Sequence, residues 1–211
     1  MPPKRSDSSH RWLKAHHQDP FVKQAHQQGL RSRAHFKLEE IQLKTHLIQP
    51  GMRVLDLGAA PGAWSVFAAQ CIGTQGALVA CDLLEMKAIP HVSIIQGDFN
   101  DLSTQAAIIK ALQGPIDVIL SDIAPNTSGI QKADQLKAMQ LSEAVLAFAV
   151  THLKMGGDLC IKVFHGVGFD AYMKQCRSYF KQVKTFKPKA SRSRSAECYI
   201  WAHHKTNSVP A

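Results

Sequence analysis

The chain has 211 residues and a mass of 23.2 kDa, enough for one domain with a substantial hydrophobic core. Its composition, 45% hydrophobic and 19% charged, argues against a disordered protein, and its longest apolar run, Ala144 to Val150, is too short to span a membrane. A net charge of +9 and a pI near 9.4 favour a polyanionic partner.

The N-terminal part of the chain is basic and rich in histidine. We expect residues 1–30 to form an appendage ahead of the folded domain, followed by a helix around Ser32–Lys44. Lys37 shares one stripe of that helix with Ala34, Leu38 and Ile41, which is an unusual place for a charge. It is therefore either a border lysine that reaches solvent or a functional group.

From Gln49 onward, short β-branched runs alternate with helical patterns, as in a doubly wound α/β sheet. The predicted strands are Arg53–Leu57, Ala77–Cys81, Ser93–Gln96, Asp117–Ser121, Asp158–Phe164, Val183–Phe186 and Cys198–Ala202. The predicted helices are Ala63–Cys71, Thr104–Leu112, Asp134–Leu153, which Gly156-Gly157 should terminate, and Phe169–Tyr179. The link between the last two strands is too short for a crossover helix, so we expect a mostly parallel sheet of six or seven strands with one reversed strand near the C-terminal edge. The expected domain covers residues 31–205, with a tail over 206–211.

The first strand runs into a glycine-rich turn, VLDLGAAPGAW, and then into a helix. Ligands of open parallel sheets bind beyond the carboxyl ends of the strands, where glycine permits close approach to the backbone. A dinucleotide fingerprint is missing, because positions 60 and 63 are alanine and position 61 is proline. The turn therefore favours a nucleoside cofactor without a pyrophosphate, and S-adenosylmethionine fits that description.

Acidic residues end the next two strands. Asp82 can accept both hydroxyls of a ribose, and Asp98-Phe99 offers an acceptor for an adenine amino group beside an aromatic face. Asp56 lies inside the first strand, where we expect it to orient the turn structurally. Unpaired buried carboxylates are costly, so these positions indicate ligands or donors nearby.

Three further charged residues lie in or beside later strands. Asp122 ends the fourth strand, Lys162 lies in the otherwise apolar fifth strand, and Glu197 heads the last strand. Lys162 is either a lysine that reaches solvent near the strand end, the commoner fate of such residues, or a functional group, since it falls with Asp122 on the ligand side of neighbouring strands.

Each candidate from the chain ends, Lys37 and Glu197, lies shortly after an Arg-Ser-Arg tripeptide. The arginines, predicted to clamp phosphate groups, are Arg31, Arg33, Arg192 and Arg194. Residues 1–40 carry +4, residues 41–170 carry −3 and residues 171–211 carry +8. This partition places the candidate site at the seam between the two basic chain ends and the acidic sheet.

Cysteine and histidine spacing matches no metal site or disulfide framework, so we expect neither. The start of the chain has no apolar segment typical of a secretory signal, and we expect a cytoplasmic protein.

At these residues the sequence resembles the FtsJ/RlmE family of ribosomal RNA large-subunit methyltransferases, which act on a uridine 2′-hydroxyl. The resemblance rests on RSRAHFKLEEI, DLGAAPGAWS, CDLLEM, QGDF, SDIAPNTSG, KVFHGVGFD and SRSRSAECYI, in order along nearly the whole chain. It implies a Rossmann-like S-adenosylmethionine-dependent methyltransferase fold with seven strands, and as substrate 23S ribosomal RNA within the 50S subunit, bound by a monomer. The implied catalytic residues are Lys37, Asp122, Lys162 and Glu197. Of these, we expect Lys162 to remove the proton of the 2′-hydroxyl, or to orient that hydroxyl while stabilising the developing oxyanion. With RNA as the substrate, the phosphates clamped by the four arginines are those of RNA. The implied cofactor contacts are Gly62, Trp64, Asp82, Asp98 and Asp122. The sequence departs from close relatives at Ala63, where we expect no more than a small shift in cofactor affinity, and at His165 and Val167, which bear on fine specificity.

Two alternatives remain within the RNA-related classes. The first is a 2′-O-methyltransferase for transfer RNA or another RNA, and the second is a ribosome-assembly factor without catalysis. A nicotinamide oxidoreductase would require G-x-G-x-x-G, and a cytosine carbon methyltransferase would require a Pro-Cys nucleophile; the sequence has neither.

Overall fold

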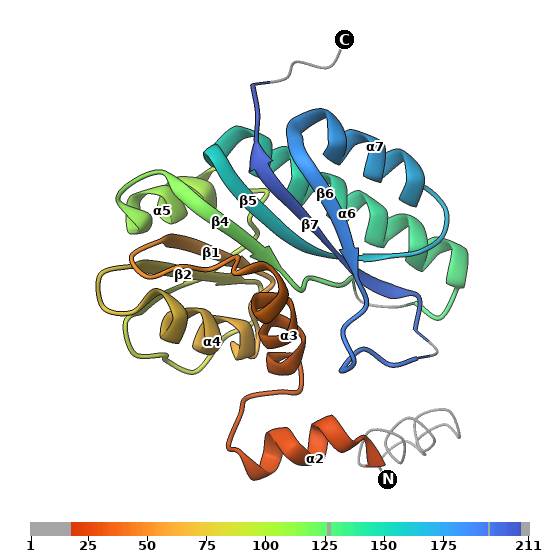
Figure 1. Cartoon of the computed structure of the whole chain (residues 1–211), viewed down its shortest axis with the longest axis horizontal. Coiled ribbons are helices and arrows are strands. Elements are labelled where there is room, and N and C mark those ends of the chain that lie inside the picture. The colour runs from red at the N-terminus through yellow and green to blue at the C-terminus, as the bar shows by residue number, and fades with distance from the viewer. Residues whose placement is uncertain (1–17, 126–127, 194, 208–211) are drawn as a thin grey trace, which may run out of the picture.

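The computed structural model describes residues 18–125, 128–193 and 195–207, which form helices on both faces of a central sheet (Figure 1). The strands are β1 (Arg53–Leu57), β2 (Ala77–Asp82), β3 (Val92–Gln96), β4 (Ile116–Ser121), β5 (Leu153–Phe164), β6 (Phe180–Phe186) and β7 (Glu197–Lys205). The helices are α2 (Pro20–Gln27), α3 (His35–Thr45), α4 (Ala63–Ile72), α5 (Leu102–Leu112), α6 (Gln131–His152) and α7 (Phe169–Tyr179).

The sheet has the strand order β3-β2-β1-β4-β5-β7-β6. Strands β1 to β5 pair in parallel, whereas β7 runs antiparallel to both of its neighbours. The predicted seven-stranded sheet with one reversed strand is therefore confirmed. Because β7 is reversed, its first residue, Glu197, lies opposite Phe164 at the end of β5. The start of β7 thus joins the edge of the sheet where the parallel strands end.

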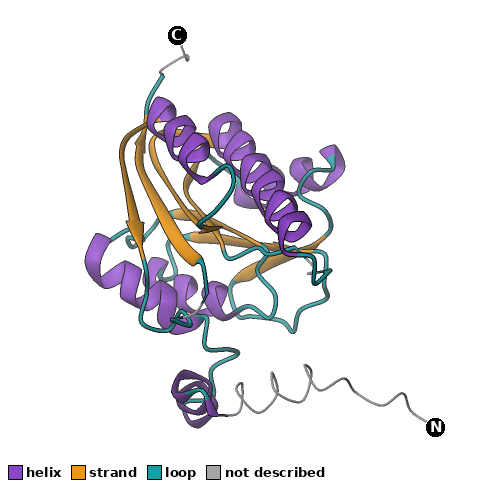
Figure 2. Ribbon diagram, turned by 90° about the vertical axis from the view of Figure 1, so that its right-hand side faces the viewer, coloured by secondary structure: helices purple, strands orange, loops and turns teal. Residues whose placement is uncertain are grey.

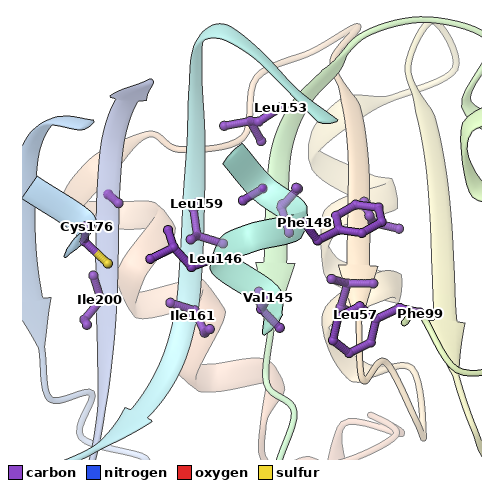
Figure 3. Close-up of a cluster of buried hydrophobic side chains, with 14 of the residues drawn as sticks. Leu57, Phe99, Val145, Leu146, Phe148, Leu153, Leu159, Ile161, Cys176 and Ile200 are labelled. Carbon is purple, nitrogen blue, oxygen red and sulfur yellow. The ribbon is translucent and has the colours of Figure 1, made fainter. Parts of the chain in front are cut away.

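Two apolar layers enclose the sheet, with α3 and α4 on one face and α5, α6 and α7 on the other (Figure 2). Successive strand residues point to opposite faces, so Ile119 belongs to the cluster under α6 and Leu120 to the cluster under α4. Figure 3 shows the first cluster, in which Phe148 of α6 packs over the strands. These layers hold the strand ends rigidly in place.

Helix α6 ends within one residue of the predicted position, but for a different reason. The helix stops at His152, and Gly156-Gly157 lie inside β5 instead of terminating a helix. Lys205 provides the stop, because its ammonium group donates to the carbonyls of Val150 and Leu153. The glycines serve the strand, whose register against β4 shifts at this point.

Helix α2 was not predicted, since residues 1–30 were treated as an appendage. Pro20 opens the helix, and the Asp19 side chain caps it by accepting from the N–H of Phe21 at 3.0 Å. Phe21 packs on Phe36 of α3 with ring centroids 5.6 Å apart. Asp-Pro before a short amphipathic segment is a helix-start signal that the sequence contained. Over the described ranges, none of the helices has the length and apolar character needed to cross a membrane.

Candidate active site

A cavity of about 670 Å³ opens beyond the carboxyl ends of β1 to β4, against α6. Its lining includes three of the predicted carboxylates, Asp82, Asp98 and Asp122. Phe99 and Leu141 supply apolar surface. The volume falls within the roughly 300–1,000 Å³ that small-molecule sites occupy.

Asp82 and Asp98 are held in place by backbone donors. The Asp82 carboxylate accepts from the N–H of Ala60 at 2.9 Å and from that of Leu84 at 2.8 Å. Asp98 accepts from the backbone and side-chain amides of Asn100 at 2.9 and 2.8 Å. A carboxylate has about four acceptor positions, so each retains capacity for ligand hydroxyl or amino groups.

Two other predicted cofactor residues do not line this cavity. The Trp64 ring is 2% exposed, and its indole N–H donates to the carbonyl of Ala34 at 2.8 Å. Gly62 has a φ of 97° and caps the start of α4. Both residues lie at the start of that helix, but the Gly62 N–H already donates to the carbonyl of Ala59 at 2.6 Å. The first-turn backbone N–H that they leave for a ligand is therefore that of Trp64.

The four predicted catalytic residues come together from four separate parts of the chain. Lys162 Nζ lies 3.1 Å from Asp122 Oδ1 and donates to the backbone carbonyl of Asp122 at 2.5 Å. Lys37 Nζ lies 2.8 Å from Glu197 Oε1 and 3.9 Å from Asp122 Oδ1. Both lysines are buried, with 5% and 7% exposure for Lys37 and Lys162. Two lysines and two carboxylates therefore share one enclosed cluster.

Tyr199 lies at the centre of this cluster and was missed by the sequence reasoning. Its hydroxyl accepts from Lys37 Nζ at 2.9 Å and donates to Asp122 Oδ1 at 2.6 Å. The ring is fully buried and packs on Trp64 with centroids 5.5 Å apart. Strand alternation was an available signal, because Tyr199 follows Glu197 by two positions and so shares its face of β7.

The charges in the cluster determine its protonation states. Burial alone would raise the pKa of the Asp122 carboxyl, but Lys162, Lys37 and the Tyr199 hydroxyl together lower it. The pKa of Glu197 is also lowered, because Lys37 and Ser191 outweigh the effect of burial. Burial and the two carboxylates raise the pKa of Tyr199 well above its usual value. Both acids are thus ionised at neutral pH, while the phenol keeps its proton.

Asp56 links β1 to α4 through Ser65, whereas the sequence led us to expect that it orients the turn between them. It is fully buried, and its Oδ2 accepts from the Ser65 hydroxyl at 2.6 Å. Its Oδ1 has no hydrogen-bond partner among the residues that the structure describes. Burial raises the pKa of Asp56 to about 7, against the lowering effect of Ser65.

The predicted RNA-binding arginines have different surroundings. Arg33 lies 2.5 Å from Asp19 Oδ2 and donates to the carbonyl of Ala190 at 3.1 Å, and Arg192 Nε lies 3.9 Å from the same carboxylate. Both arginines line a second cavity, of about 480 Å³, together with Lys189. Arg31 points elsewhere, toward the glycine-rich turn. Arg194 lies outside the described residues.

The second cavity adjoins the catalytic cluster. Ser191 lines the cavity and donates from its hydroxyl to Glu197 Oε1 at 2.7 Å. One hydrogen bond therefore connects the basic cavity to the carboxylate that holds Lys37.

Comparison with known proteins gives a consistent result. A family model described as FtsJ-like methyltransferase matches residues 30–205. The chain is 52% identical to Ribosomal RNA large subunit methyltransferase E of Alkalilimnicola ehrlichii over 200 residues, which cover 94% of this chain and 96% of that protein. It is 51% identical over 199 residues to the protein of the same name from Pseudomonas aeruginosa, again covering 94% and 96%.

Solved structures confirm the predicted Rossmann-like methyltransferase fold. A putative ribosomal RNA methyltransferase from Plasmodium falciparum superposes with a TM-score of 0.74 at 26% identity, covering 83% of this chain and 98% of that one. A putative rRNA methylase from Clostridium thermocellum, with a TM-score of 0.56 at 15% identity over 81% of this chain and 97% of that one, shows the likeness of fold alone.

Proposed function

The chain belongs to the FtsJ-like methyltransferase family, and from that premise we propose that it methylates a uridine 2′-hydroxyl in 23S ribosomal RNA of the 50S subunit, with S-adenosylmethionine as donor. The observation that carries the proposal is the convergence of Lys37, Asp122, Lys162 and Glu197 beside the 670 Å³ cavity. The names of the curated relatives support ribosomal RNA of the large subunit as the substrate.

The cavity fits S-adenosylmethionine by the chemistry of its donors and acceptors. Asp82 would accept from the ribose hydroxyls and Asp98 from the adenine amino group, because both carboxylates line the cavity with acceptor capacity remaining. Phe99 and Leu141 offer apolar surface to the base. Trp64 would contribute a backbone N–H in the first turn of α4, whereas the N–H of Gly62 is already used by the carbonyl of Ala59. When bound, the cofactor supplies a methyl group already activated on a sulfonium.

The residues of the cluster would perform the other tasks of the reaction. The alkyl donor is activated in advance, so the protein must align the ribose and remove the proton of its 2′-hydroxyl. We assign the proton to Lys162 Nζ. In the neutral amine, two N–H groups match the two oxygens of Asp122 that Nζ contacts, and the lone pair is then left for the hydroxyl proton.

Lys37 provides the second positive charge beside the reacting oxygen. Glu197 and Tyr199 fix its ammonium group at 2.8 and 2.9 Å, so little reorganisation is needed as negative charge develops on the hydroxyl. Asp122 positions both lysines through its carboxylate.

The direct test is transfer of a labelled methyl group from S-adenosylmethionine to 50S subunits purified from a strain that lacks the enzyme. We expect one 2′-O-methyluridine in 23S RNA, located by mapping the labelled nucleotide. Label on a base would overturn the proposal. Label on transfer RNA alone would replace the substrate, and the absence of transfer despite cofactor binding would indicate an assembly factor.

Lys162→Ala tests the assigned proton acceptor. The rate of methyl transfer should fall by about 10²–10⁴-fold, the usual contribution of a positioned acid or base, while S-adenosylmethionine still binds with nearly unchanged affinity. Lys154→Ala is the matched control, because Lys154 lies on the same strand but pairs with Asp117, away from the cavity lining. Normal turnover of Lys162→Ala would remove Lys162 from the mechanism.

A further inference from the structure

Arg31 lies in the segment between α2 and α3 that carries the first Arg-Ser-Arg tripeptide. Its guanidinium donates to three backbone carbonyls: Nη1 to Pro61 and Lys87, both at 2.9 Å, and Nη2 to Ala88 at 2.7 Å. Pro61 belongs to the glycine-rich turn after β1, and the other two acceptors belong to the loop after β2. Arg31 therefore joins two loops that are distant in sequence.

Both of these loops form walls of the cofactor cavity. Gly58 and Ala60 of the turn line it, and so do Leu83 and Leu84 of the loop after β2. Three of the five guanidinium donors are used on these carbonyls, so at most two remain for any other partner. Arg31 thus faces the cofactor side of the domain.

Arg33, two residues later, contacts a different part of the molecule. Its partners are Asp19 and the carbonyl of Ala190, on the side of the second cavity. The two arginines of this tripeptide therefore bind different parts of the molecule: Arg31 binds loops beside the first cavity, and Arg33 binds groups beside the second. The tripeptide is not a uniform basic patch.

The turn is held from a second side by Asp82, which accepts from the N–H of Ala60 at 2.9 Å. Arg31 also fills the space that a side chain at position 62 would need: a Cβ on Gly62 would lie 2.9 Å from Arg31 Nη1 and 2.9 Å from Ile89 Cδ1. The turn is thus held between a carboxylate and a guanidinium that packs directly over its glycine.

We infer that Arg31 is a positioning residue for the glycine-rich turn. By holding the turn in place, Arg31 raises the affinity for S-adenosylmethionine, and it is not a phosphate clamp for RNA. The inference deepens the proposed function and rests on it. Without the guanidinium, the hydrogen bonds that join the turn to the loop after β2 are lost. The two loops must then be ordered when the ligand binds, and the free-energy cost of that ordering lowers the affinity.

Arg31→Ala, titrated with S-adenosylmethionine in the absence of RNA, should show a dissociation constant about ten-fold higher than the wild-type chain. Arg31→Lys should give an intermediate value, since an ammonium group supplies donors from a single point and not from a planar fork. Millimolar methylguanidinium should restore part of the affinity of the alanine variant. If Arg31→Ala lowered the affinity only by destabilising the whole fold, methylguanidinium would not restore it.

Arg53→Ala is the matched control, because the Arg53 guanidinium also donates to a backbone carbonyl, that of Leu112 at the end of α5, at 3.1 Å. Arg53 lies at the start of β1, away from the cavity lining. Its affinity for the cofactor should equal that of the wild-type chain. Unchanged cofactor affinity in Arg31→Ala, with weaker RNA binding and a salt slope reduced by about one, would overturn the inference in favour of a phosphate clamp. Failure of the wild-type chain to bind S-adenosylmethionine would instead overturn the proposed function.

Discussion

The Tyr199 hydroxyl connects the two halves of the catalytic cluster, since it contacts Lys37 on one side and Asp122 on the other. A phenol that stays protonated can accept from the cation and donate to the carboxylate at the same time. This fixes the distance between the charge brought by α3 and the charge that follows β4. Tyr199 therefore acts as a positioning residue for Lys37.

Tyr199→Phe should lower the rate of methyl transfer about ten-fold, because the ring still packs on Trp64 while two charge-assisted hydrogen bonds are lost. The affinity for S-adenosylmethionine should stay within two-fold of the wild-type value in calorimetric titration. Tyr172→Phe is the control, since Tyr172 is equally buried but donates to the carbonyl of Ser142 away from the cavity lining. Equal rates for the two variants would contradict a role for the bridging hydroxyl.

The buried Asp56 carboxyl makes the free energy of folding depend on pH. Its folded pKa of about 7 lies above the ordinary value of 3.8 in the unfolded chain, so its contribution favours folding below pH 4 and is lost as the pH rises through 7. A difference of this size between the two pKa values corresponds to about 4 kcal/mol.

Asp56→Asn should remove this dependence. The free energy of unfolding of the variant, minus that of the wild-type chain, should increase by about 2–4 kcal/mol between pH 4 and pH 8, measured by denaturant titration. Asp170→Asn, which changes an exposed carboxylate, should show no such trend. A difference that is constant with pH would mean that Asp56 is ionised throughout.

The sequence predicted the charged members of the cluster because lysines and acids are conspicuous in apolar strands and helices. Lys162 in β5 and Lys37 on the buried stripe of α3 stand out in this way. Tyr199 does not, because tyrosine is an ordinary strand residue and its hydroxyl is informative only when its partners are known. The three-dimensional arrangement was needed to identify it.

At the scale of elements, the strands were easier to predict than the features that modify them. Alternating apolar runs located all seven strands, and β1 and α7 were predicted with their observed bounds. The C-terminal end of α6 was predicted within one residue, but the predicted glycine stop was wrong, because Lys205, 52 residues beyond Leu153, donates to the last carbonyls and no local pattern reports such a contact. Helix α2 was not predicted, because the basic, histidine-rich composition of residues 1–30 conceals the cap at Asp19.

Asp19 joins α2 to the rest of the molecule in two ways, since one oxygen caps the helix and the other pairs with Arg33. Asp19→Asn keeps a good capping residue but removes the charge, whereas Asp19→Ala removes both. The free energy of local opening of α2 should fall by about 1 kcal/mol in the first variant and about 2 kcal/mol in the second. Hydrogen exchange of the α2 amides measures this, with the amides of β4 as the internal reference. No effect of Asp19→Asn would exclude a contribution from the ion pair, and equal effects of the two variants would exclude a contribution from the cap.

At the scale of the whole molecule, the charge partition coincides with the architecture. The mildly acidic middle of the chain forms the sheet strands that line the cofactor cavity. The basic ends meet at the second cavity, where Arg33 comes from one end and Lys189 from the other. Composition thus predicted the class of partner, whereas the meeting of the two ends depends on β7 lying inside the sheet.

Lys189→Ala should weaken RNA binding at every sequence and lower the slope of log K against log salt by about one, if Lys189 contacts a phosphate. Lys110→Ala removes an exposed lysine from α5, away from both cavity linings, and should leave the slope unchanged. Filter binding over a series of salt concentrations gives both values. An identical slope for the two variants would place the RNA elsewhere on the molecule.

The position of β7 between β5 and β6 also has a consequence for folding during synthesis. Ribosomes release the N-terminal part of a chain first, so β1 to β6 leave the exit tunnel before the strand that joins β6 to the others. Until Glu197–Lys205 emerges, β5 has an open edge, and Lys37 lacks both Glu197 and Tyr199. We therefore expect the cluster around Lys37 to be completed only when the last strand inserts, because a nascent chain without that strand lacks Glu197 and Tyr199.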